Sequence, residues 1–133
     1  MSSVPRNFKL LDELEKAEKG ENDPSISLGL ITADDRFMSD WQATIFAAPA
    51  FLEPRLWFLT LHAGQNYPKE PPVVKFTSRI NADFVDARGN VNSSKLNTLR
   101  EWKPSLGLIN VLVEIKSLIS SAPRSQPADG STF

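Results

Sequence analysis

The sequence predicts an α+β domain: an N-terminal helix, a four-stranded antiparallel meander, a long irregular loop and a core helix. Two patterns carry this prediction. Apolar residues recur with the helical period near both ends of the chain, and four short segments between them have the composition of strands. Short links between these segments favour antiparallel pairing. With 133 residues, the chain is long enough for one domain with its own core, so we take 1–133 as a single domain.

The first helix is expected from Pro5 to Lys19, with Gly20 ending it. Proline suits a first helical position, because its missing N–H would be unpaired there. An apolar stripe should face the core, and it consists of Leu10, Leu11, Leu14 and Ala17. At 100° per residue, Phe8 falls about 160° from Leu10 and points away from the stripe. Such a ring either packs on its own chain or contacts a partner, and the sequence leaves both open.

The strand segments are Ser25–Ile31, Trp41–Ala48, Arg55–Leu61 and Val73–Phe76. The first three have a second face, which carries Ser27, Thr44, Phe46, Leu56 and Phe58. One core helix can cover only one face of a meander, so we expect this second face to stay open. Three apolar side chains among small hydroxyl groups then indicate a binding surface. The alternative is that the C-terminal segment covers it.

Residues 77–107 show little periodicity and predict a long irregular loop, a kind of segment that is often functional. The core helix is expected at Leu108–Ser121, before Pro123. Its apolar positions follow the i, i+3, i+4 spacing and are Leu108, Val111, Leu112, Ile115, Leu118 and Ile119. The tail, residues 122–133, is expected to be loosely packed or mobile.

Composition excludes several function classes. Fifteen basic and sixteen acidic residues give a formal charge of −1, so phosphate-driven nucleic-acid binding is not expected. The absence of cysteine and the single histidine, His62, argue against disulfides, metal sites and histidine catalysis. His62 reads as a strand-end residue. We expect no cofactor, and no membrane association because the sequence shows neither a signal core nor an apolar span. Cytoplasmic and/or nuclear residence follows as an expectation.

Two motifs resemble those of ubiquitin-conjugating enzymes. Residues 67–72 read Tyr-Pro-Lys-Glu-Pro-Pro, similar to the family's Tyr-Pro-x-x-Pro-Pro turn, and residues 102–106 read Trp-Lys-Pro-Ser-Leu, similar to its Trp-Ser-Pro-Ala-Leu segment. The resemblance extends from residue 5 to about residue 121. It implies the ubiquitin-conjugating-enzyme-like fold, here expected without the last two helices of active enzymes.

The catalytic positions of that family are altered. Active members have a His-Pro-Asn triplet before a nucleophilic cysteine, whereas residues 79–81 here read Arg-Ile-Asn. Residues 89–92 read Gly-Asn-Val-Asn where the family has Gly-x-Ile-Cys, so Asn92 occupies the nucleophile position. Ser93 and Ser94 lie beside it, but a hydroxyl needs an adjacent base to react, and the sequence offers no histidine there. The protein is therefore not expected to be an enzyme.

A closer resemblance is to the ubiquitin-conjugating enzyme variants of the chain-elongation type. It rests on residues 4–15, Val-Pro-Arg-Asn-Phe-Lys-Leu-Leu-Asp-Glu-Leu-Glu, on Ser-Leu-Gly-Leu at 27–30, and on the Gln-Pro-x-x-Gly-x-Thr-Phe ending. The departures lie in the shortened 48–55 loop, with Pro54 and an apolar Phe51-Leu52 pair.

This resemblance implies a non-catalytic subunit. Such variants form a heterodimer with an active ubiquitin-conjugating enzyme and hold an acceptor ubiquitin, weakly and noncovalently, for chains linked through lysine 63 of ubiquitin. The positions that it implies for the partner enzyme are Val4, Pro5, Arg6, Asn7, Phe8 and Leu11. Those for ubiquitin are Ser27, Thr44 and Leu56, with Phe46 and Phe58 as neighbours. A ubiquitin ligase would be reached through the partner enzyme.

Two other readings remain. A variant of the endosomal-sorting type would share the fold and the missing cysteine but bind proline-rich peptides or ubiquitin. A plain interaction module would have no ubiquitin role. In an NMR titration with ubiquitin, shifts confined to Ser27, Thr44 and Leu56 would support the chain-building role, and no shifts would favour the plain module.

Overall fold

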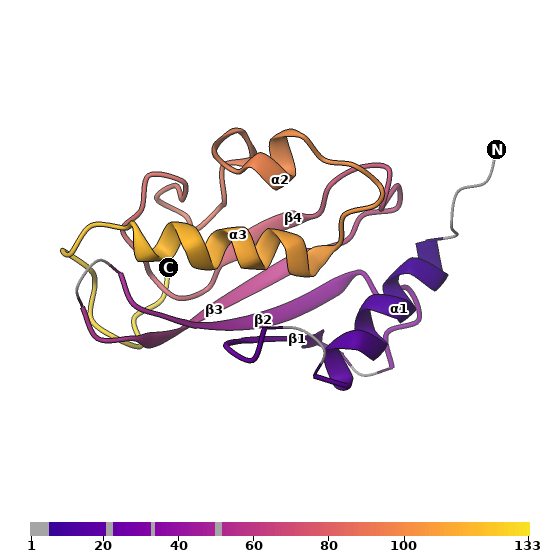
Figure 1. Ribbon diagram of the computed structural model, residues 1–133, viewed down its shortest axis with the longest axis horizontal. Helices are drawn as coiled ribbons and strands as arrows, with labels where there is room; N and C mark the ends of the chain where they lie inside the picture. The colour runs from indigo at the N-terminus through magenta and orange to yellow at the C-terminus, as the bar shows by residue number, and fades with distance from the viewer. Residues whose placement is uncertain (1–5, 21–22, 33, 50–51) are drawn as a thin grey trace.

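The computed structural model describes residues 6–20, 23–32, 34–49 and 52–133, and it has the expected α+β architecture (Figure 1). Its elements in chain order are α1 (Arg6–Glu18), β1 (Ile26–Leu30), β2 (Asp40–Ala47), β3 (Arg55–His62), β4 (Val73–Phe76), the 3₁₀ helix η1 (Ser93–Lys95), α2 (Asn97–Arg100) and α3 (Leu108–Ser120). Pro5, predicted to begin the first helix, lies outside the described residues.

The four strands form one antiparallel sheet in the order β1-β2-β3-β4, which confirms the meander. Burial alternates along the two central strands, because successive side chains point to opposite faces. Their inner face buries Trp41, Ala43, Ile45, Ala47, Trp57, Leu59 and Leu61. The core helix α3 lies across this inner face, as Figure 1 shows, and leaves the outer face of the sheet free.

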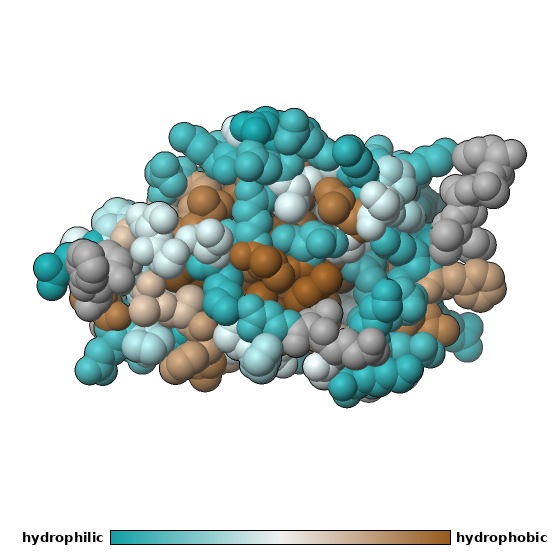
Figure 2. All heavy atoms as spheres, in the orientation of Figure 1, coloured by the Kyte–Doolittle hydropathy of each residue, from teal (hydrophilic) through white to brown (hydrophobic). Residues whose placement is uncertain are grey.

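Helix α3 buries Leu108, Val111, Leu112, Ile115 and Ile119, whereas Leu118 is only partly buried. On the side that faces solvent, Val113 is 46% exposed. Figure 2 shows an apolar area over this helix with hydrophilic side chains around it. Among the described residues, no helix is long and apolar enough to cross a membrane.

The predicted stripe on α1 was wrong at one position. Leu10 is fully buried, but Leu11 is 44% exposed, and Glu13 is buried instead at 8% exposure. Glu13 and Leu11 flank Leu10 on the helix at about −60° and +100°, so the core-facing side is centred nearer to Glu13. The sequence analysis placed Leu11 in the core because leucine is hydrophobic. Glu13 can be buried in its place because it has hydrogen-bond partners, but these are distant in the sequence and could not be foreseen.

The loop at 77–107 is more regular than predicted, because it contains η1 and α2. The carboxylate of Glu114 on α3 accepts hydrogen bonds from the N–H groups of Asn97 (2.7 Å) and Thr98 (2.8 Å). These two groups belong to the first turn of α2, where backbone donors have no partner within the helix. A distant carboxylate therefore stabilises a helix that is too short for a periodic signal.

The tail makes several hydrogen bonds to the rest of the chain, although its side chains after Ala122 are exposed or only partly buried. Ser131 accepts a bond from the N–H of Arg79 (2.8 Å), and the N–H of Phe133 donates to Thr77 (3.2 Å). The Gln126 side chain pairs with both the N–H and the carbonyl of Asn81, at 2.8 Å each. These bonds join polar groups that are far apart in the sequence, so no local sequence pattern predicts them. They attach the tail to the segment that follows β4.

Candidate functional site

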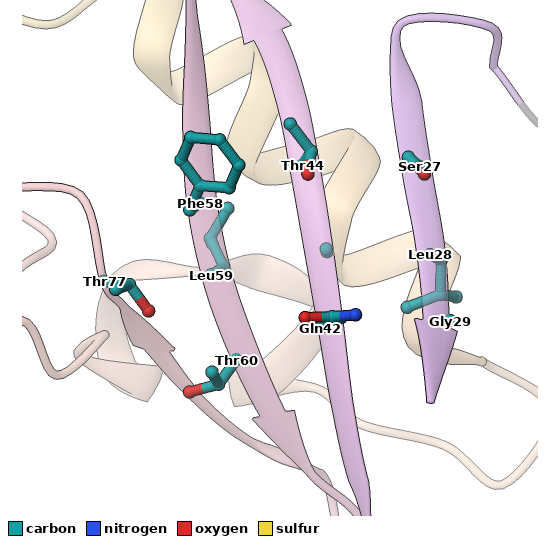
Figure 3. Close-up of a pocket in the computed structure, with 10 residues that line it drawn as sticks. Ser27, Leu28, Gly29, Gln42, Thr44, Phe58, Leu59, Thr60 and Thr77 are labelled. Atoms are coloured by element: carbon teal, nitrogen blue, oxygen red, sulfur yellow. The ribbon is translucent and has the colours of Figure 1, made fainter. Parts of the chain in front are cut away.

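The outer face of the sheet brings the predicted ubiquitin-binding residues together. Ser27 pairs with Thr44, Thr44 pairs with Phe58, and Phe46 pairs with Leu56 in the strand register. Figure 3 shows Ser27, Thr44 and Phe58 on three neighbouring strands. Directly opposite residues of an antiparallel pair have Cβ atoms about 4.5–5.5 Å apart, so the five side chains form one continuous patch. We call this group the outer-face patch.

The outer-face patch is accessible. Phe46 and Leu56 are each 48% exposed, Phe58 is 49% exposed, and Ser27 is exposed as well. Thr44, between them, is partly buried. The prediction that this face stays open is thereby confirmed for these positions, and the tail does not cover them. Whether the patch binds ubiquitin remains a prediction.

A shallow cavity of about 480 Å³ continues the patch toward the polar side of the face. Its lining includes Gln42, Thr60 and Thr77 as well as Ser27, Thr44 and Phe58 (Figure 3). The face thus has apolar side chains at one end and amide and hydroxyl groups at the other. Such an arrangement suits a protein partner that presents an apolar centre with a polar border.

The backbone under Phe58 is fixed from the side of β4. The N–H of Phe58 donates to the buried hydroxyl of Ser78 (2.8 Å), and its carbonyl accepts from the N–H groups of Thr77 (2.8 Å) and Ser78 (3.1 Å). Phe133, in turn, donates to Thr77. The tail therefore helps to hold the strand that displays Phe58, one of the two aromatic rings of the outer-face patch.

The residues predicted for the partner enzyme have different surroundings. Phe8 is 66% exposed, as its helical position predicts, and Leu11 and Asn7 also face solvent. Arg6 is used within the protein: its guanidinium donates to the carbonyls of Gly64 (2.9 Å) and Ala63 (2.8 Å) and to two groups of the connection between β1 and β2. Val4 and Pro5 lie outside the described residues.

Asn92, at the predicted nucleophile position, has a structural role. Its side-chain oxygen caps η1 by accepting from the N–H (3.0 Å) and the hydroxyl (2.7 Å) of Ser94. An amide oxygen cannot deprotonate that hydroxyl, so Ser94 lacks the base that an oxyester mechanism needs. Asn81, the remnant of the triplet, donates its side-chain amide to Ser125 (3.0 Å).

The sequence analysis did not identify the structural role of Glu13, which lies on α1 beside the segment predicted to bind the partner enzyme. Its carboxylate accepts from the hydroxyl of Tyr67 (2.6 Å) and from the N–H of Leu108 at the start of α3. Burial raises the pKa of Glu13 above its ordinary value, although both hydrogen bonds act in the opposite direction. Burial, with the nearby Glu13 charge, also raises the pKa of Tyr67. Glu13 therefore joins α1, the Tyr-Pro turn and α3.

The two family motifs meet in the structure. The indole N–H of Trp102 donates to the carbonyl of Pro68 (2.7 Å), and the rings of Trp102 and Tyr67 lie 5.8 Å apart. Tyr67 and Pro68 are joined by a cis peptide bond. No group of three or more His, Cys, Asp or Glu residues suited to a metal ion occurs within the described ranges.

A meander backed by one core helix and a Tyr-Pro turn packed on a tryptophan define a ubiquitin-conjugating-enzyme-like fold, in a chain that contains no cysteine. The chain belongs to the ubiquitin-conjugating enzyme family, whose model, described as "Ubiquitin-conjugating enzyme", matches residues 9–133. It is similar in fold to human ubiquitin-conjugating enzyme E2 G1, with a TM-score of 0.76 and 25% identity over 90% of this chain and 98% of that one.

Its similarity to variants of the family is higher. The chain is 39% identical to the ubiquitin-conjugating enzyme variant MMS2 of Saccharomyces cerevisiae, over the full length of both. It is 36% identical to ubiquitin-conjugating enzyme E2 variant 1D of Arabidopsis thaliana, over 98% of this chain and 92% of that one. It is also 49% identical to ubiquitin-conjugating enzyme spm2 of Schizosaccharomyces pombe, over 100% and 99%. The protein is thus a ubiquitin-conjugating enzyme variant.

Proposed function

We propose that this protein pairs with an active ubiquitin-conjugating enzyme and positions an acceptor ubiquitin for the synthesis of lysine-63-linked chains. The observation that carries the proposal is the outer-face patch, in which exposed apolar side chains lie next to Ser27 and Thr44 on a rigid sheet. Membership of the ubiquitin-conjugating enzyme family and the similarity to its variants support the proposal. We expect the heterodimer to act in the cytoplasm and/or nucleus, with any ligase bound through the active enzyme.

Positioning is the mechanism that remains for a chain without a cysteine. The active partner would carry the donor ubiquitin as a thioester, and the outer-face patch would hold the acceptor so that one lysine reaches it. Holding two reactants in the correct geometry lowers the barrier by up to about 7–11 kcal/mol in favourable cases. Small side chains at Ser27 and Thr44 allow close approach of the two surfaces. Weak binding suits this role, because the extended chain has to leave.

Reconstitution tests the proposal. An activating enzyme, ATP, ubiquitin and an active ubiquitin-conjugating enzyme of the family are incubated with and without this protein, and linkages are identified by mass spectrometry. We expect lysine-63 linkages to form only when the protein is present, and to disappear with ubiquitin whose lysine 63 is replaced by arginine. Equal products in both mixtures would show that the proposal is wrong, as would ubiquitin linked covalently to this protein as an ester when the active conjugating enzyme is left out.

A further inference from the structure

The turn before β2 is held rigidly. The carboxylate of Asp35 accepts hydrogen bonds from the N–H groups of Phe37 (3.0 Å) and Ser39 (3.1 Å). Met38 adopts a positive φ of 49°, and its carbonyl accepts from the indole N–H of Trp41 (2.7 Å). A left-handed conformation is uncommon for a residue other than glycine, and it persists where the surroundings hold it in place. Residues 35–39 therefore form a turn with a defined shape.

This turn displays an aromatic ring that the fold does not bury. Phe37 is 70% exposed, the highest value among the large hydrophobic residues that the structure describes. Its N–H and carbonyl are both hydrogen-bonded, so the backbone that carries the ring is fixed. A ring on a rigid support loses little conformational entropy when a partner covers it, which favours binding.

Arg6 connects this turn to α1. Its guanidinium donates to the carbonyl of Phe37 and to the hydroxyl of Ser39 (3.1 Å), while it also bonds to the carbonyls that follow β3. Figure 1 shows α1 at the end of the sheet beside the connection between β1 and β2. Phe8 is two residues beyond Arg6 and is 66% exposed, and Leu11 is one turn further at 44%. Arg6 thus joins the Phe37 turn to the start of α1, the helix that carries Phe8 and Leu11.

We propose that Phe37 is a second aromatic contact for the active ubiquitin-conjugating enzyme, next to Phe8, with Asp35 and Arg6 as positioning residues. The proposal rests on the heterodimer of the proposed function and adds to it. The resemblance assigns the contact to residues 4–8 and Leu11 alone, whereas the hydrogen bonds of Arg6 make the Phe37 turn part of the same rigid surface. The partner should therefore present two neighbouring apolar pockets or one elongated groove.

The test measures the dissociation constant of the complex by isothermal titration calorimetry. A ring that is exposed in the free protein and buried at the centre of an interface in the complex contributes about 10- to 30-fold in affinity. We expect a loss of that size for Phe37→Ala. Asp35→Ala keeps the ring but frees the turn, and should weaken binding about 3- to 10-fold. The control is Val113→Ala, because Val113 is an exposed apolar residue on α3 outside both proposed surfaces. It should change affinity less than about twofold.

The outcomes separate this inference from the proposed function. If Phe8→Ala removes binding while Phe37→Ala binds like the wild type, the inference is wrong and the heterodimer stands. If the wild type does not bind or Phe8→Ala has no effect, the proposed interface itself fails. If the isolated protein self-associates and Phe37→Ala abolishes this, the ring serves a second copy and the inference is again wrong. Ubiquitin titration of Asp35→Ala should be unchanged, which a general loss of structure would not allow.

Discussion

Replacement of Leu56 by alanine tests the outer-face patch most directly. Leu56 is 48% exposed and pairs with Phe46 at one end of β2 and β3. Because half of the side chain already faces solvent, the change removes few contacts within the core, and the protein should keep its fold. An effect on ubiquitin binding would then report on the surface and not on the stability of the domain.

The expected magnitude follows from the exposed area. Complete burial of a leucine side chain is worth about 1.5–3 kcal/mol, and about half of that remains to be gained when a partner covers Leu56. Truncation to alanine should therefore cost about 1 kcal/mol, which corresponds to a dissociation constant about fivefold larger. On a complex that is already weak, this loss should reduce chain synthesis at low ubiquitin concentration.

The assay is an NMR titration of isotopically labelled ubiquitin with the wild type and with Leu56→Ala. Val113→Ala is a matched control, because Val113 is 46% exposed but lies on α3. We expect the dissociation constant for ubiquitin to be about fivefold larger for Leu56→Ala and unchanged for the control. The affinity of both variants for the partner enzyme should be unchanged. Equal constants for all three proteins would refute the reasoning, as would an equal loss in both variants.

Two further predictions concern stability. Because burial raises the pKa of Glu13 above its ordinary value of 4.5, the folded state binds the proton more tightly, and the free energy of unfolding decreases as the pH rises from 4.5 through the raised pKa. In urea unfolding, the difference in the free energy of unfolding between the wild type and Glu13→Gln should shrink across that pH range. A difference that does not change with pH would contradict this prediction. Gly89 has φ +93°, and a Cβ there would lie 2.5 Å from the carbonyl oxygen of Phe76 and 2.8 Å from the ring of Phe133. Gly89→Ala should lose about 1–3 kcal/mol, whereas Gly29→Ala, with open space around it, should lose less than about 1 kcal/mol; similar losses would count against the steric argument.

Periodicity predicted the parts of this fold that bury long apolar rows. The alternation in β2 and β3 and the repeat in α3 are each long enough to separate an inner from an outer face. The same alternation identified the outer-face patch. It could not identify α2, which has four residues and depends on Glu114 from another helix. Nor could it show the tail contacts, which are mostly bonds to backbone groups.

Side chains with distant polar partners were the hardest to interpret from the sequence. Glu13, between Asp12 and Leu14, looks like a solvent-exposed charge until its partners, Tyr67 and the start of α3, are known. Arg6 belongs to the segment that is predicted to bind the partner enzyme, and its acceptors within the protein could not be found from the sequence because they are distant in it. Phe37 is one aromatic residue in a polar stretch, and only the hydrogen bonds around Asp35 show that its backbone is fixed.

The two proposed surfaces are joined by a single strand, and this bears on how a protein without a catalytic group could select one lysine. The Phe37 turn leads directly into β2, and Thr44 of the outer-face patch lies on that strand five residues after Ser39. At about 3.3 Å per residue, this corresponds to a separation of about 16 Å along a strand that is hydrogen-bonded on both sides. Sheet backbone of this kind deforms little compared with a loop, so the site for the partner enzyme and the site for ubiquitin would keep a fixed relation. A fixed relation is what lysine selection by geometry requires, because a displacement of about 1 Å can already reduce the rate of a positioned reaction about 100-fold.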